Sequence, residues 1–77
     1  MSRIPDTVYH GYEIFTVILP IGDGRWSATS EIESNGAEGI DISQGFGGPC
    51  EGNTMEEARA LVLVDTKQKI DDLLAEP

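Results

Sequence analysis

The sequence has little of several residue types on which small proteins build chemistry or cross-links. It contains a single cysteine, Cys50, and a single histidine, His10. One cysteine excludes an intramolecular disulfide and a four-cysteine zinc site, so packing has to hold the core. No apolar run reaches membrane-spanning length, and the first residues hold no apolar segment long enough for a signal peptide. These absences predict a protein of the reducing cytoplasm.

Basic residues are scarce too. Five Lys and Arg side chains stand against 14 Asp and Glu, which gives a formal net charge of −9. Binding to nucleic acid requires clustered Lys and Arg to neutralise phosphates, and the five here are scattered along the chain. The same argument disfavours anionic membranes. A basic protein is the partner that this charge favours, although solubility alone also explains an acidic excess.

What the sequence does have is enough apolar material for one small core. Apolar residues make up 39% of the 77-residue chain. A domain of this size buries only about 60% of the surface that its unfolded chain exposes. No internal repeat, linker or low-complexity block divides the sequence. It therefore predicts a single domain over residues 1–77, in which residues 1–7 form a loose N-terminal arm.

Two β-rich runs separated by Asp23-Gly24 predict a hairpin, because both central residues of the favoured two-residue turn need positive φ. The first strand is expected from Tyr12 to Leu19, ended by Pro20, and the second from Arg25 to Glu33. The second run alternates apolar and polar residues, as a half-buried strand does. Its predicted core face consists of Trp26, Ala28, Ser30 and Ile32.

The register of this hairpin follows from a two-residue loop, in which Arg25 faces Gly22 and Leu19 faces Ala28. Three residues of the first strand then join the core: Phe15, Val17 and Leu19. Three others are left on the outer face: Tyr12, Ile14 and Ile18. A three-residue loop would reverse both faces, because side chains alternate along a strand.

A third strand, Ile40 to Phe46, is expected after a five-residue loop. It would set Ile42 beside Ile32, and Phe46 beside Ala28. The residues that follow contain the strongest breakers of regular structure in the sequence. These glycines and the proline are interpreted as ending the third strand: Gly45, Gly47, Gly48 and Pro49.

The C-terminal third of the sequence predicts one long helix. Thr54-x-x-Glu57 fits a capping box, with Asn53 as the rival cap. At about 100° per residue, one apolar stripe faces the sheet: Met55, Ala58, Val62, Thr66, Ile70 and Leu73, flanked by Leu63. Leu61 and Val64 lie well away from this stripe, and a single sheet cannot cover both sides of the helix.

Together these elements predict an α+β fold, with a three-stranded antiparallel sheet in β-β-β-α order and one long C-terminal helix packed on one face. The run from Gly48 to Ala58, GPCEGNTMEEA, follows a strand that opens with Tyr12 and a hairpin at Asp23-Gly24. It resembles the HicB-like antitoxin domain, in which a G-D-T-x-E-E-A turn starts the helix after three strands. The resemblance implies an acidic domain that masks a small basic ribonuclease.

Three motifs could carry chemistry but lack the partners that the chemistry needs. Gly45 to Gly48 could bring backbone amides to a phosphate, but no Gly-Lys-Ser/Thr follows. A Cys50–His10 dyad would need a depressed thiol pKa, and nothing in the sequence sets its geometry. Three acids match no calcium loop in spacing: Glu38, Asp41 and Glu51. We therefore expect no enzyme activity, no cofactor and no metal.

Two apolar features stay outside the predicted core. They are Tyr12, Ile14 and Ile18 on the outer sheet face, and Leu61 with Val64 on the outer helix face. Apolar residues gathered on the surface of a small domain mark a contact surface. The sequence thus predicts a non-enzymatic protein-interaction module that associates with itself or with a basic partner. A small-ligand-binding module is the alternative, and it would need a pocket under the loop from Gly45 to Gly52.

Overall fold

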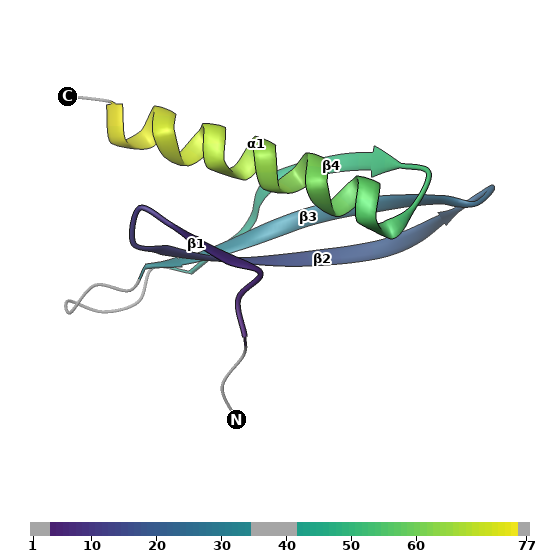
Figure 1. The fold of residues 1–77 in the computed structure, drawn as a ribbon, viewed down its shortest axis with the longest axis horizontal. Coiled ribbons are helices and arrows are strands. Elements are labelled where there is room, and N and C mark those ends of the chain that lie inside the picture. Colours follow the sequence, from purple (N-terminus) through teal and green to yellow (C-terminus); the bar gives the residue numbers. More distant parts are fainter. Residues whose placement is uncertain (1–3, 35–41, 76–77) are drawn as a thin grey trace.

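The computed structural model describes residues 4–34 and 42–75. They form a four-stranded antiparallel sheet in the order β1-β2-β3-β4 and a helix, α1, which lies across one face of it (Figure 1). The elements are β1 (Thr7–Tyr9), β2 (Tyr12–Gly22), β3 (Arg25–Ser34), β4 (Ile42–Gly52) and α1 (Met55–Ala75). The predicted α+β fold with one helix on an antiparallel sheet is confirmed, but the sheet has four strands rather than three.

The additional strand is β1, which is three residues long and too short to show an alternating pattern. It joins β2 through a turn in which His10 and Gly11 have φ of 51° and 82°, the positive values that a two-residue hairpin turn favours. Just before β1, the Asp6 carboxylate accepts hydrogen bonds from the amide and hydroxyl of Thr16, at 2.8 and 3.0 Å. The predicted loose arm is therefore wrong at Asp6 and Thr7.

The turn between β2 and β3 confirms the predicted hairpin. Gly22 pairs with Arg25, and the loop residues Asp23 and Gly24 have φ of 55° and 71°. The predicted core face of β3 is also right, since all four of its residues are buried or half-buried toward α1: Trp26, Ala28, Ser30 and Ile32.

A β-bulge makes the predicted faces of β2 wrong. Pro20 pairs with Trp26, so Ile21 is an extra residue without a partner on β3. One extra residue sends every earlier side chain of the strand to the opposite face. Three residues predicted to lie outside therefore face α1: Tyr12, Ile14 and Ile18. Three residues predicted to enter the core lie on the other face: Phe15, Val17 and Leu19.

Strand β4 continues well past its predicted end at Phe46. It pairs Ser43 with Ile32 and Cys50 with Ala28, and its register shifts twice in between, so the predicted neighbours were wrong. Glycines with positive φ at Gly45 and Gly48 (66° and 79°) accommodate these irregularities inside an edge strand rather than ending it. Residues 40 and 41 of the predicted strand lie outside the described residues.

Helix α1 begins as its capping box predicts. The Glu57 amide donates to Thr54 Oγ1 at 3.0 Å, and the Glu57 carboxylate accepts from the Asn53 amide at 3.1 Å. The centre of the predicted stripe is buried: Ala58, Val62, Thr66 and Ile70. Met55 and Leu73 are 48% and 47% exposed, so the buried stripe does not extend to either end of the helix.

The core consists of two small clusters between α1 and the sheet. One contains Ile14, Ile32 and Ile70, and the other contains Ala28, Ala58 and Val62. Both depend on residues of β3 that face the helix. Within the described ranges, no helix has the length and apolarity that a membrane span requires.

Candidate interaction surfaces

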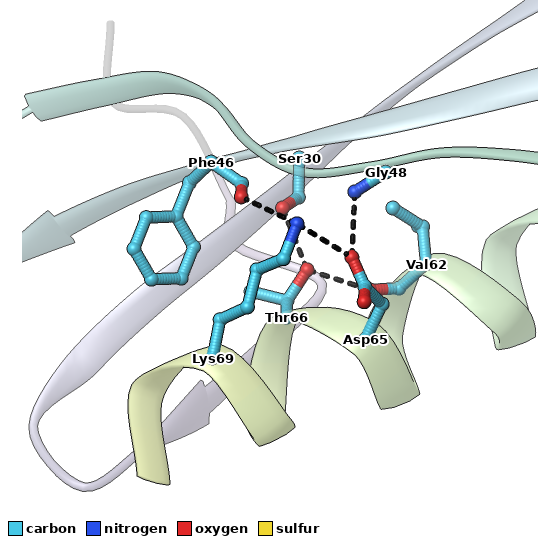
Figure 2. A network of polar contacts seen from close by, with 7 residues as sticks. All are labelled: Ser30, Phe46, Gly48, Val62, Asp65, Thr66 and Lys69. Atoms are coloured by element: carbon cyan, nitrogen blue, oxygen red, sulfur yellow. Dashed lines mark hydrogen bonds and ion pairs between the residues drawn. The ribbon is translucent and has the colours of Figure 1, made fainter. Parts of the chain in front are cut away.

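Two buried hydroxyls join α1 to β3 between the core clusters (Figure 2). Ser30 Oγ and Thr66 Oγ1 lie 2.6 Å apart, and Thr66 Oγ1 donates to the Val62 carbonyl at 2.6 Å. Because the Thr66 proton is used on Val62, Ser30 has to donate to Thr66. Both side chains are fully buried, so neither hydroxyl is available to a substrate, and the pair is a packing contact.

The glycine-rich part of β4 is held to α1 by charged side chains (Figure 2). The Gly48 amide donates to Asp65 Oδ2 at 2.8 Å. Lys69 Nζ lies 3.1 Å from the same oxygen and donates to the Phe46 carbonyl at 3.3 Å. A carboxylate of the protein thus already uses the Gly48 amide that a phosphate loop would offer to its ligand.

Three glycines of this segment pack closely against neighbouring elements. A Cβ at Gly47 would overlap the two buried hydroxyls, and one at Gly48 would overlap the Ala28 carbonyl. At Gly52 it would come within 2.7 Å of the Ala58 amide nitrogen. These close approaches show that β4 packs directly on its neighbours at these three positions. A pocket elsewhere along the segment, which a small-ligand-binding module needs, stays a prediction.

The contacts of Asp65 make a testable contribution to acid stability. The Gly48 amide, and after it the Lys69 ammonium, lower the pKa of Asp65 below its usual 3.8. Folding thus favours the carboxylate, so its contribution to stability is complete above that value and is lost as the pH falls through the lowered pKa. We expect Asp65→Asn to be less stable than the native protein at neutral pH, and this difference to shrink below about pH 4.

Urea unfolding of both proteins between about pH 7 and about pH 2 measures this difference. Asp72→Asn is the matched control, because Asp72 is an exposed residue of the same helix. Within the described structure, its carboxylate accepts a hydrogen bond only from the Gln68 side chain. A pH-independent difference between Asp65→Asn and the native protein would contradict a role for the Asp65 charge.

Cys50 and His10 do not form a dyad. Cys50 packs against the cluster of Ala28, Ala58 and Val62. His10 Nε2 lies 3.6 Å from Asp71 Oδ1. Val62, the residue of this cluster closest to Asp71 along α1, is nine positions away from it, which corresponds to about 13 Å along the helix axis. Burial, and after it the nearby Asp65 carboxylate, raise the pKa of the Cys50 thiol, which is the opposite of what a nucleophile needs.

The acids considered for a cation are not gathered into a site by the described residues. No group of three His, Cys, Asp or Glu in residues 4–34 and 42–75 is placed to hold a metal. Glu51 forms an ion pair with Arg25 at 3.1 Å. Glu38 and Asp41 lie outside the described residues.

The predicted contact residues divide into two groups. Ile14 is fully buried, and Tyr12 and Ile18 pack against the core clusters, so the sheet half of the predicted surface was wrong. Leu61 and Val64 are 46% and 69% exposed, as their position on the helix predicts. Whether they contact a partner stays a prediction.

The bulge at Ile21 gives the sheet a different exposed surface. We call the side of the sheet opposite α1 the open face. Val17 and Leu19 are 37% and 60% exposed there, and the hairpin that carries them extends past the first turn of α1 (Figure 1). Val8 is exposed on β1, whereas Phe15 is buried. The sequence signal for this surface is Pro20-Ile21 before the turn, since a proline near a strand end is typical of a bulge.

The other end of the open face is acidic. Glu13 of β2 and Glu33 of β3 are direct cross-strand partners, and like charges in that position destabilise a sheet. Within the described residues, no Lys or Arg forms an ion pair with either. The open face therefore has an aliphatic end at Val17 and Leu19 and an acidic end at Glu13 and Glu33.

Comparison of the chain with protein-family models, with curated proteins and with solved structures gave no match.

Proposed function

We propose that this protein is a non-enzymatic interaction module that binds a basic polypeptide on the open face of its sheet. The observation that carries the proposal is the combination of exposed Val17 and Leu19 with the Glu13–Glu33 pair on one surface. Burying the aliphatic side chains favours association at roughly 25 cal/mol per Å². Cations of the partner would relieve the repulsion between the two carboxylates.

Long-range electrostatics support a basic partner. The net charge of −9 attracts cationic proteins and raises their association rate, and it repels a second copy of this chain. The antitoxin role implied by the HicB-like resemblance is one instance of the proposal, because its partner would be a small basic ribonuclease. A gene for a small basic protein beside the gene for this chain would favour that instance.

Self-association is the second candidate, and the exposure of Leu61 and Val64 favours it. These two residues lie about one helical turn apart on α1. Two copies could associate through them, helix to helix, without bringing the acidic open faces of their sheets together. Light scattering tests this candidate. A dimer that becomes a monomer in Val64→Glu would support it, and a monomer at high concentration would count against it.

Selection of peptides on the folded protein tests the main proposal. A displayed library of random peptides, each about 20 residues long, should yield binders with a net positive charge. Val17→Ser/Leu19→Ser should weaken their affinity at least tenfold, which corresponds to about 1.4 kcal/mol. Leu61→Ser/Val64→Ser should leave the affinity within about twofold.

The control pair is matched, since each variant replaces one exposed valine and one exposed leucine with serine. Urea unfolding of both variants shows that each is folded. Binders without positive charge, or binders that tolerate Val17→Ser/Leu19→Ser and are lost in Leu61→Ser/Val64→Ser, would overturn the proposal.

A further inference from the structure

We infer that a segment of the basic partner binds as an extended strand along the free edge of β2, which we define as the β1 side of residues 16–20. The backbone of the segment pairs with Thr16 and Ile18, and its alternate side chains pack beside Val17 and Leu19. This inference rests on the proposed function. It specifies the conformation of the bound segment and the backbone groups that hold it.

Strand β2 continues well beyond its pairing with β1. The pairs with β1 end at Thr7 and Ile14, whereas β2 runs on to Gly22 (Figure 1). Within residues 4–34 and 42–75, no other strand lies on this side of β2. A strand edge without a neighbour exposes amides and carbonyls that another chain can use for pairing.

Two hydrogen bonds show which backbone groups of β2 point to the free edge. The Ile14 carbonyl accepts from the Asp6 amide at 2.8 Å, and the Thr16 amide donates to the Asp6 carboxylate at 2.8 Å. Asp6 directly precedes β1, so both bonds are on the β1 side. The pairing of β2 with β3 is regular over residues 12–20, so this orientation repeats at every second residue. The Thr16 carbonyl and both backbone groups of Ile18 therefore point to the free edge.

Strand β1 cannot extend along the free edge. If the register of β1 continued, Pro5 would face Thr16, and a proline has no amide hydrogen for the Thr16 carbonyl. The Thr16 amide is already bound by Asp6, which forms an ion pair with Arg59 of α1 at 2.8 Å. Among the described residues, the Ile18 amide and carbonyl consequently have no backbone partner.

The other outer strands are less suited to pairing. At the opposite edge of the sheet, the Gly48 amide of β4 already donates to Asp65 of α1. The Phe46 carbonyl of β4 accepts from Lys69, and Pro49 has no amide hydrogen. Strand β1 has only three residues, and very short edge strands are poor templates for pairing. The free edge of β2 is therefore favoured over both as the place where a strand is added.

The side chains beside the free edge match an extended aliphatic segment. Val17 and Leu19 are exposed on the open face and flank Ile18 in β2. Neighbouring strands bring alternate side chains together on one face, so the added strand needs aliphatic residues at two positions, i and i+2. These contacts end at Val17. They do not depend on the part of the open face at Phe15, which is buried.

A second copy of β2 does not fit the free edge. Two antiparallel β2 strands centred on Ile18 would place Gly22 of one copy opposite Ile14 of the other. Ile14 already pairs with Thr7 of its own β1, so the Asp23-Gly24 turn would collide with β1. The net charge of −9 also repels a second copy. A basic segment of about five residues, which spans about 17 Å when extended, avoids both obstacles.

N-methylation of the peptide backbone, one residue at a time, tests the added strand with the tightest peptide from the selection and the full chain. A methyl group on an amide that donates to Thr16 or Ile18 removes the hydrogen bond and obstructs the approach of the two strands. We expect a loss of affinity of about tenfold or more at two positions that are two residues apart. At the position between them, the loss should be less than about twofold.

Two substitutions at Ile18 test the same pairing from the protein side. Ile18→Pro removes the amide hydrogen that points to the free edge, whereas Ile18→Ala shortens the side chain and keeps the amide. Relative to Ile18→Ala, Ile18→Pro should bind the peptide about tenfold more weakly or worse. Urea unfolding shows whether each variant is folded.

Hydrogen exchange of the native protein provides a measurement that needs no variant. When the peptide is bound, the Ile18 amide should exchange about tenfold more slowly or less. The Thr16 amide already donates to Asp6 in the free protein, so its exchange should change by less than about twofold.

The possible failures can be told apart. Binding that is weakened by Val17→Ser/Leu19→Ser, but shows no alternation in the N-methyl scan and no slowing of Ile18 exchange, would overturn the added strand and leave the open face as the binding surface. Binding that tolerates Val17→Ser/Leu19→Ser, with the variant folded, would overturn this inference and the proposed function together.

Discussion

Replacing Gly47 with alanine is expected to destabilise the protein by about 3 kcal/mol. The new methyl group would overlap Thr66 Oγ1 and Ser30 Oγ, the two hydroxyls buried between α1 and β3. Neither hydroxyl can move aside without breaking a buried hydrogen bond. A domain of 77 residues has a total stability of about 4–12 kcal/mol, so the loss is a large fraction. Urea unfolding measures it.

Two controls separate the steric effect at Gly47 from other costs. Gly24→Ala adds a methyl group in open space at a φ of 71°, so it should cost only about 1 kcal/mol of backbone strain. In a Ser30→Ala/Thr66→Ala background, neither hydroxyl is left to clash or to lose its partner, and Gly47→Ala should cost much less. An equal cost in both backgrounds would contradict the steric explanation.

Truncating Ile14 is expected to cost about 2–5 kcal/mol, whereas truncating Val17 costs less than about 1 kcal/mol. Ile14 is fully buried against Ile32 and Ile70, and Val17 is partly exposed on the open face. The comparison between Ile14→Ala and Val17→Ala tests the register of β2 directly. The register without the bulge predicts the reverse order of costs, because it places Val17 in the core.

Ile14→Ala removes much of the stability of so small a domain. Ile14→Val is the milder substitution, with an expected cost of about 0.5–1.5 kcal/mol. It should stay folded and be no more stable than Val17→Ala, as judged from urea midpoints of proteins with equal m-values. A midpoint for Val17→Ala well below that of Ile14→Val would contradict the assigned faces.

The elements that were predictable have a local cause in the sequence. The Asp23-Gly24 turn follows from residues that tolerate positive φ, and both have it. The helix start follows from the Thr54 hydroxyl, which accepts a hydrogen bond from the Glu57 amide. The buried stripe follows from helical periodicity, and its central residues Val62 and Thr66 are fully buried.

The errors arose where distant contacts decide the local structure. Pro20 before Ile21 is compatible with a bulge and with a regular strand end alike, and a one-residue slip exchanges the two faces of β2. Gly47 and Gly48 look like the end of a strand, but they allow β4 to pass close to Thr66 and Val62 of α1. The open face was missed because it depends on the bulge.

Methyl chemical shifts of the labelled protein, recorded as the selected basic peptide is added, test most directly whether the open face is the binding surface. Val17 and Leu19 carry the aliphatic end of that face, and Leu61 and Val64 provide equivalent exposed methyl groups on α1. The proposed function predicts large shifts at Val17 and Leu19 and none at Leu61 and Val64. Shifts confined to Leu61 and Val64 would contradict it.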